Sequence, residues 1–459
     1  MNIGFGKLLI SRFMGIHLLP GQVVAIAAIG LIVLGGCLLM LPFATKPGAH
    51  LGLIDALFTA TSAVCVTGLI VMDTPQDFTA FGQGVILFLI QIGGLGYALM
   101  ATLILLMLGR RLGLRDRMML SESMSTMDMQ GLVRFVKLVT LITFSLEGIG
   151  AVLLTLRFAI DHPWNTAAYY GIFHAISAFN NAGFALFSDS LTSFQTDWTI
   201  NVIVTTLVIL GSIGFLVFED FLDNYRGTRF RFGTHTKVVV TTTGILIAVG
   251  MFGIAILEWN NPATLQPLSI GDTFTVSYFH AVSRTAGFTT LNLGEMREPT
   301  LYFLLILMAI GGSPGSMSGG IKTTTIAIVF LTIWSLLRRE SDVEVFHRRI
   351  PPDLITRALC LTILALALIT GMTLLLTSTE SQPFLSLMFE VTSAMGIVGM
   401  SLGDGDTRSL SALLTDFGKV MIMLSMLVGR FGPLLIGLSA VKTSVHKPYR
   451  HAQSRVMIG

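Results

Sequence analysis

The sequence predicts an all-α polytopic membrane protein made of four similar units in a pseudo-fourfold arrangement. Three observations lead to this prediction. The 459 residues are 53% hydrophobic and 12% charged, with a mean hydropathy of +0.78, and apolar runs of about 20 residues match the thickness of a bilayer. A short motif ending in glycine recurs four times along the chain. Lysine and arginine concentrate in the connections between the predicted units.

The recurring motif reads SAVCVTG, SAFNNAG, AVSRTAG and SAMGIVG in chain order. A phenylalanine stands ten residues before the last glycine in the first, second and fourth copies, and eight residues before it in the third. Successive last glycines are 115, 104 and 112 residues apart, which indicates four copies of one structural unit. The glycines are Gly68, Gly183, Gly287 and Gly399, and the phenylalanines are Phe58, Phe173, Phe279 and Phe389.

Each unit is predicted to contain a long helix, a short helix and a second long helix, which gives eight transmembrane spans. The units cover residues 1–117, 118–230, 231–345 and 346–441, and a cytoplasmic or interfacial tail follows at 442–459. Asp55 and Asp272 precede two of the short segments and are predicted to cap those helices. The long helices are expected near 22–42 and 82–108, 132–160 and 199–221, 238–257 and 301–337 (interrupted), and 354–376 and 415–441.

Positive charge is distributed unequally between the two sides of the predicted spans. The connections between units and the two tails hold clusters such as Arg110, Arg111, Arg115 and Arg117, whereas few basic residues lie inside the units. Cytoplasmic loops are enriched in lysine and arginine, so both termini are predicted to be cytoplasmic and the short helices to enter from outside. The formal net charge of +3 is too small to indicate a nucleic-acid partner. Three scattered cysteines indicate no disulfide framework.

The short helices are too brief to cross a bilayer, so each is predicted to dip halfway into the membrane and return. Non-helical backbone at that depth must be buried in protein or line a water-filled passage, and rings of backbone carbonyls can replace the water around a monovalent cation. Ordinary helix packing by small residues is the alternative. The residues predicted to line an ion passage, in extended conformation, are Val64, Cys65, Val66, Thr67 and Gly68; Asn180, Asn181, Ala182 and Gly183; Arg284, Thr285, Ala286 and Gly287; and Gly396, Ile397, Val398 and Gly399. Among these, Arg284 is expected to brace the backbone.

These motifs resemble the four filter segments of the Ktr/Trk/HKT superfamily of potassium transporters, in which a helix, a pore helix and a helix (M1-P-M2) repeat four times. TATSAVCVTGL, SAFNNAGF, SRTAGF and SAMGIVGMSLG look most like those of the Ktr membrane subunit. The resemblance implies K⁺ uptake across a bacterial inner membrane through a channel-like pore, with K⁺ as the only bound metal, at the filter. It also implies Na⁺ dependence, a homodimer, no cofactor in this chain, and regulation by a cytosolic KtrA-like RCK ring subunit that binds nucleotide.

A second repeat, G-x-x-G, lies in the long helix after each motif, at Gly93–Gly96, Gly211–Gly214, Gly312–Gly315 and Gly429–Gly432. Three copies are interpreted as close-packing kinks. The third is rich in helix breakers and is predicted to form a mobile intramembrane loop, which the resemblance implies is a gate; a kinked helix is the alternative. The loop residues are Gly311, Gly312, Ser313, Pro314, Gly315, Ser316, Met317, Ser318, Gly319 and Gly320.

Arg430 stands inside the fourth G-x-x-G, deep in an apolar run. A charged residue at that depth is expensive and therefore a functional candidate. It is predicted to face the passage and hold the loop closed, and a structural role in capping loop carbonyls is the alternative. Two other protein classes are considered. A coupled secondary transporter with broken helices would be expected to show inverted repeats, and an intramembrane enzyme would need a catalytic constellation that the spans lack.

Overall fold

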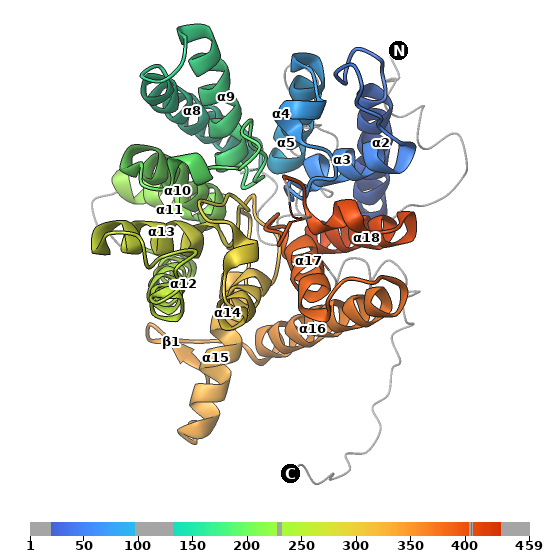
Figure 1. Ribbon diagram of the computed structural model, residues 1–459. Coiled ribbons are helices and arrows are strands. Elements are labelled where there is room, and N and C mark those ends of the chain that lie inside the picture. Colours follow the sequence, from blue (N-terminus) through green and yellow to red (C-terminus); the bar gives the residue numbers. More distant parts are fainter. Residues whose placement is uncertain (1–19, 97–131, 227–231, 404, 406, 433–459) are drawn as a thin grey trace, which may run out of the picture.

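The computed structural model describes residues 20–96, 132–226, 232–403, 405 and 407–432, and they are mostly helical (Figure 1). Each predicted unit contributes a long helix and a short helix, followed by one further helix in the first and fourth units and by two in the second and third. Their bounds are α2 (Pro20–Leu39), α3 (Leu53–Cys65) and α5 (Ala80–Leu95); α8 (Leu132–Phe158), α9 (Trp164–Phe179), α10 (Trp198–Ile213) and α11 (Phe215–Arg226); α12 (Thr234–Glu258), α13 (Ile270–Ser283), α14 (Glu298–Ala309) and α15 (Thr323–Leu337); and α16 (Pro352–Thr379), α17 (Phe384–Gly396) and α18 (Asp416–Phe431).

Smaller elements fill the connections between these helices. They are the four-residue helix α4 (Thr74–Asp77), the 3₁₀ turns η1 (Thr192–Phe194), η2 (Leu293–Glu295) and η3 (Leu410–Leu413), and the strands β1 (Glu344–Val345) and β2 (Arg348–Arg349). The two strands pair antiparallel between α15 and α16.

The helix predicted at 199–221 is wrong in one respect, because it is two helices. α10 ends at Ile213 and α11 begins at Phe215, with a bend of 91° between them. Gly214 lies between the two at φ +95°, in the left-handed region that glycine adopts without strain. The second unit is therefore broken at the same kind of position as the third, where α14 and α15 are separated.

The units pack against one another in a closed cycle. α5 packs on α9, α10 on α13, α14 on α17 and α18 on α3, so the second helix of each unit contacts the short helix of the next. Figure 1 accordingly shows the blue start and the red end of the described chain side by side, with the other units completing the circuit. The arrangement places the ends of the four short helices in the middle of the molecule.

The outward faces of the long helices are apolar and exposed. Leu141 on α8, Ile256 on α12 and Ile363 on α16 are 67%, 73% and 65% exposed. Continuous apolar exposure on this scale indicates contact with lipid. Within the described residues, three helices are long and apolar enough to cross a membrane, and the bent pair α10–α11 makes a fourth candidate.

Eight spans remain a prediction, because the other apolar helices in the described part of the chain have 10–17 residues. The predicted spans 82–108 and 415–441 extend past the described residues, which end at 96 and 432 there. The arginine cluster 110–117, the N-terminal basic residues and the tail 442–459 also lie outside the described residues.

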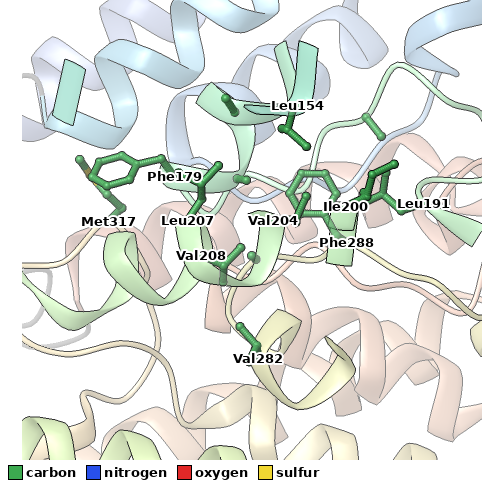
Figure 2. Packing of buried hydrophobic residues seen from close by; sticks show 14 of the residues in the cluster. Leu154, Phe179, Leu191, Ile200, Val204, Leu207, Val208, Val282, Phe288 and Met317 are labelled. Carbon is green, nitrogen blue, oxygen red and sulfur yellow. The ribbon is translucent and has the colours of Figure 1, made fainter. Parts of the chain in front are cut away.

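The core consists of the four short helices themselves. The phenylalanine that marks each repeat is fully buried in all four units. From α9, Phe179 joins a buried cluster with Leu207 of α10 and with Met317, which comes from the segment between α14 and α15 (Figure 2). Short helices packed on every side can hold their C-terminal ends in fixed positions.

The predicted capping roles of Asp55 and Asp272 are wrong in position. Both lie inside the first turn of their helices, after the cap residues Gly52 and Ser269. Asp55 instead pairs with Lys419 of α18, with an N–O distance of 2.7 Å. A carboxylate one turn in still suits the positive end of the helix dipole, and the ion pair adds a tie between the first and last units.

Candidate ion pathway

The four motif glycines meet in a closed ring. A Cβ atom added to any one of them would press against a backbone carbonyl oxygen of the next motif. It would also lie 3.0–3.3 Å from the Cα atom of that motif's own glycine. All four have φ between +71° and +96°, so both space and backbone conformation require glycine. The contacts run from Gly68 to Ala182, from Gly183 to Ala286, from Gly287 to Val398 and from Gly399 to Thr67.

The motif backbone reaches this ring through a left-handed turn in three units. Val66, Asn181 and Ile397 have φ of 62°, 58° and 56°. Such values are rare for the β-branched Val66 and Ile397, whereas asparagine adopts them more readily. The turn lets the next N–H group bond back to the helix; the amide of Thr67 donates to the carbonyl of Ser62 at 2.8 Å. This pattern closes a helix C-terminus.

The prediction that all motif residues are extended is therefore wrong for the first ones in each segment. Val64, Cys65 and Gly396 belong to the final turns of α3 and α17, and Asn180 has helical dihedral angles. The short helices therefore extend further along the motifs than predicted. The left-handed residue after α3 and α17 lets the following amide donate to a carbonyl in the last turn of the helix.

A serine supports each motif, and sequence reasoning missed it although the letters SA recur in three copies. The hydroxyls of Ser62 and Ser393 accept hydrogen bonds from the N–H groups of Gly68 and Gly399, both at 3.0 Å. The hydroxyls of the other two, Ser177 and Ser283, donate to the carbonyls of the residues after their glycines. The recurrence of serine before each glycine was the available signal.

The ring forms part of the wall of a cavity of about 320 Å³. Its lining includes the four glycines and, from the loops that follow them, residues such as Asp73, Asn292 and Arg408. Among the predicted ion-passage residues, only the glycines line this cavity. A cation in it would meet the backbone of the four motifs at their glycines.

Side chains brace the second motif from behind. The amide of Asn180 donates to Glu147 of α8 at 2.8 Å and to Gln91 of α5 at 3.3 Å. The amide of Asn181 donates to the carbonyl and hydroxyl of Thr285 at 3.3 and 3.1 Å. These bonds connect the second motif to α8 of its own unit, to α5 of the first unit and to the third motif.

Arg284 does brace backbone, but not in its own motif. Its guanidinium donates to the carbonyls of Leu307 at 3.4 Å, Ile310, and Gly311 at 3.5 Å. These carbonyls stand in the last turn of α14 and just after it, where a helix leaves some of its carbonyls without intrahelical partners. A cation at a helix C-terminus also complements the dipole.

The G-x-x-G copies share more than a kink. Their second glycines, Gly96, Gly214, Gly315 and Gly432, all have φ between +70° and +95°. Their first glycines allow backbone contact with the short helices; a Cβ at Gly93, Gly211 or Gly429 would overlap the carbonyl oxygen of Val64, Phe179 or Met395. The prediction of close packing is therefore confirmed for the first glycine of these three copies. The second glycine has a different role, because it interrupts or ends a helix.

The segment 311–320 is a loop with a closed neck, as its glycine content predicts. At the neck, the amide of Gly311 donates to the carbonyl of Ile321 at 2.9 Å, and the amide of Ile321 donates to Ala309 at 3.1 Å. At the tip, the amides of Ser313 and Met317 donate to the ends of α10, at Ser212 and Gly211. The loop is thus docked against the break in the second unit.

Two cationic side chains hold adjacent carbonyls of this loop. Arg430 donates to the carbonyl of Met317 and also to Gly93 and, at 3.2 Å, Gly94 of α5. Lys322 donates to the carbonyl of Ser318 at 2.6 Å. Arg430 therefore joins the first, third and fourth units through backbone oxygens. These contacts are compatible with both roles predicted for it.

Long helices with exposed apolar faces around a buried ring of short helices identify a multi-pass membrane protein. The family model described as "Cation transport protein" (TrkH) matches residues 22–447. The chain belongs to this family of cation transport proteins.

Individual relatives agree with this membership. The chain is 43% identical over 426 residues to the Ktr system potassium uptake protein B of Bacillus subtilis, covering 92% of this chain and 93% of that protein. It is 37% identical over 416 residues to the protein of the same name from Vibrio alginolyticus, covering 90% of each. The solved structure of the potassium transporter TrkH from Vibrio parahaemolyticus matches with a TM-score of 0.72 at 20% identity, over 94% of this chain and 86% of that one, and so supports the fold.

Proposed function

We propose that this protein takes up potassium ions across a bacterial inner membrane, through one pore at the centre of the four units. The glycine ring is the observation that carries the proposal. Four backbone segments meet there in a closed cycle at the wall of a cavity, and backbone carbonyls are the ligands that replace the water around K⁺. Relatives at 43% and 37% identity are named as potassium uptake proteins.

The loop 311–320 is the gate of this pore in our proposal. It lies between the end of α10 and Arg430, and its hydrogen bonds to both run through backbone groups that could exchange partners. Arg430 holds the loop closed and raises an electrostatic barrier to cations.

The remaining features extend the proposal from relatives to this chain. A Ktr system implies a second, cytosolic subunit, which we propose is an RCK ring that binds nucleotide. We also propose Na⁺ as an activator, a homodimer in which each protomer has its own pore, and cytoplasmic termini. The closed cycle of packing between units supports the pore within one protomer.

Ion fluxes of glycine variants test the pore. The full chain is expressed in cells that lack potassium uptake, and K⁺ and Na⁺ uptake are measured for the wild type and for Gly68→Ser and Gly287→Ser. A pore keeps conducting and loses its preference for K⁺ over Na⁺. A coupled secondary transporter, the alternative, loses most of its transport, and that result in variants that accumulate in the membrane and unfold at the wild-type temperature would reject the pore.

A further inference from the structure

The neck of the loop touches two of the four filter motifs directly. On one side, Arg284 of the third motif holds the carbonyls of Ile310 and Gly311. On the other side, Gly319 packs on Ile397 of the fourth motif. Both motif residues are almost completely buried, with exposures of 3% and 0%. The loop and the ring are therefore in contact through packed groups.

The contact at Gly319 has no spare room. A Cβ atom added to Gly319 would lie 2.6 Å from the Cβ atom of Ile397 and closer still to its Cγ1 atom. Ile397 is held in a left-handed conformation at φ 56°, where a β-branched side chain is strained. Surrounding packing must hold it in that conformation, and Gly319 is one part of that packing.

The neck itself is a single unit. Its two strands of chain are joined by hydrogen bonds. They are also in van der Waals contact, because a Cβ at Gly311 would lie 3.0 Å from the Cα atom of Gly320. Gly396, just before Ile397, lies equally close to α14: a Cβ there would be 2.7 Å from the carbonyl oxygen of Met308. An outward movement of the loop would thus displace the neck against both motifs.

We propose that the loop and the ion filter are coupled through Arg284 and Ile397, so that the state of the loop sets how strictly the filter prefers one monovalent cation over another. This inference rests on the proposed function, in which the loop gates the pore. Arg284 and Ile397 are positioning residues for the third and fourth motifs. Packed interiors switch between discrete arrangements rather than deform smoothly, so a shift of the neck changes the spacing of carbonyls in the ring.

Selectivity measured separately from total flux tests the coupling. Purified full-length protein is reconstituted in liposomes, and K⁺ and Na⁺ fluxes are recorded for Gly319→Ala and Arg284→Gln. We expect the K⁺/Na⁺ flux ratio to fall by about threefold or more in each, as for groups in direct contact. Ile397→Gly in the Gly319→Ala background removes the overlapping side chain and should restore part of the ratio.

Two controls keep the outcomes apart. Gly371→Ala on α16, where an added Cβ has no neighbour within 4 Å, should leave the ratio unchanged. If Gly319→Ala does not accumulate in the membrane, Ile397→Val replaces it, since Val66 occupies the equivalent left-handed position of the first motif; a shifted ratio is again expected.

Arg430→Gln separates the coupling from the gate. Suppose that this variant raises flux while the variants at 284, 319 and 397 all keep the wild-type K⁺/Na⁺ flux ratio. The gate is then supported, and the proposed coupling is wrong. If the wild type conducts neither ion, or Arg430→Gln leaves the flux unchanged, the proposed function itself fails.

Discussion

The glycine ring and the helix breaks each take one member from every predicted unit, and the members of the ring are more alike than the breaks. In the ring, each unit supplies a glycine with positive φ and presents a carbonyl to its neighbour. In the G-x-x-G copies, four glycines with positive φ lead to different results: a bend of 91° after α10, a loop after α14, and helix ends at Leu95 and Phe431. A closed ring needs four equal members, because each contacts the next, whereas the breaks can specialise independently.

Disturbing one member of the ring is expected to have the largest effect. In Gly399→Ala the added Cβ would overlap the carbonyl oxygen of Thr67, which costs about 1–3 kcal/mol for overpacking. The left-handed conformation adds about 1–2 kcal/mol. Thermal unfolding in detergent and K⁺ flux measure the loss of stability and of transport. A variant that unfolds at the wild-type temperature would contradict the close contact between neighbouring motifs in the ring.

A change at Arg430, which bonds to the loop 311–320, is expected to affect gating and leave the fold intact. Arg430→Gln removes the charge that bonds to Met317 and Gly93. Because hydrogen bonds to a charged group contribute about 1.5–3 kcal/mol, K⁺ flux should rise about tenfold. Deletion of residues 313–318 should raise it as well and reduce regulation. Unchanged uptake kinetics in both variants would show that no gate lies here.

A bond between two ring members should have a moderate effect. Asn181→Gly keeps the left-handed backbone and removes the amide that reaches Thr285. We expect a loss of about 1 kcal/mol of stability together with a lower K⁺/Na⁺ ratio. Unfolding and flux are measured on the same preparation; a loss of stability with an unaltered ratio would assign the amide to the fold alone.

The smallest effect is expected for a glycine that belongs to neither region. Gly371 lies in α16 with open space around it. Alanine there favours the helix by up to about 1 kcal/mol, so the melting temperature should stay the same or rise slightly while flux stays unchanged. A loss of transport would show that glycine is required for reasons other than contact and conformation.

Sequence reasoning located the ring and the loop for physical reasons that act locally. Glycine recurs wherever a side chain would collide or φ must be positive, so a repeat of single glycines was visible without coordinates. The break after α10 was predicted only as a kink, because Gly214 lies in an apolar run without the proline that marks the third unit. The first residues of each motif were placed in extended backbone, because a helix end closed by Val66 or Ile397 has no signature in residue type.

The sequence by itself determined the helical class, the apolar character, the fourfold recurrence of the motif and the positions that only glycine can occupy, since these follow from composition and spacing. Only the tertiary structure decided that each motif contacts the next one. It also decided that the Arg284 guanidinium binds carbonyls at the end of α14 rather than those of its own motif. It also decided that Ile397 touches the loop. These are contacts between residues of different units, and nothing in the chain near either partner encodes the distance between them.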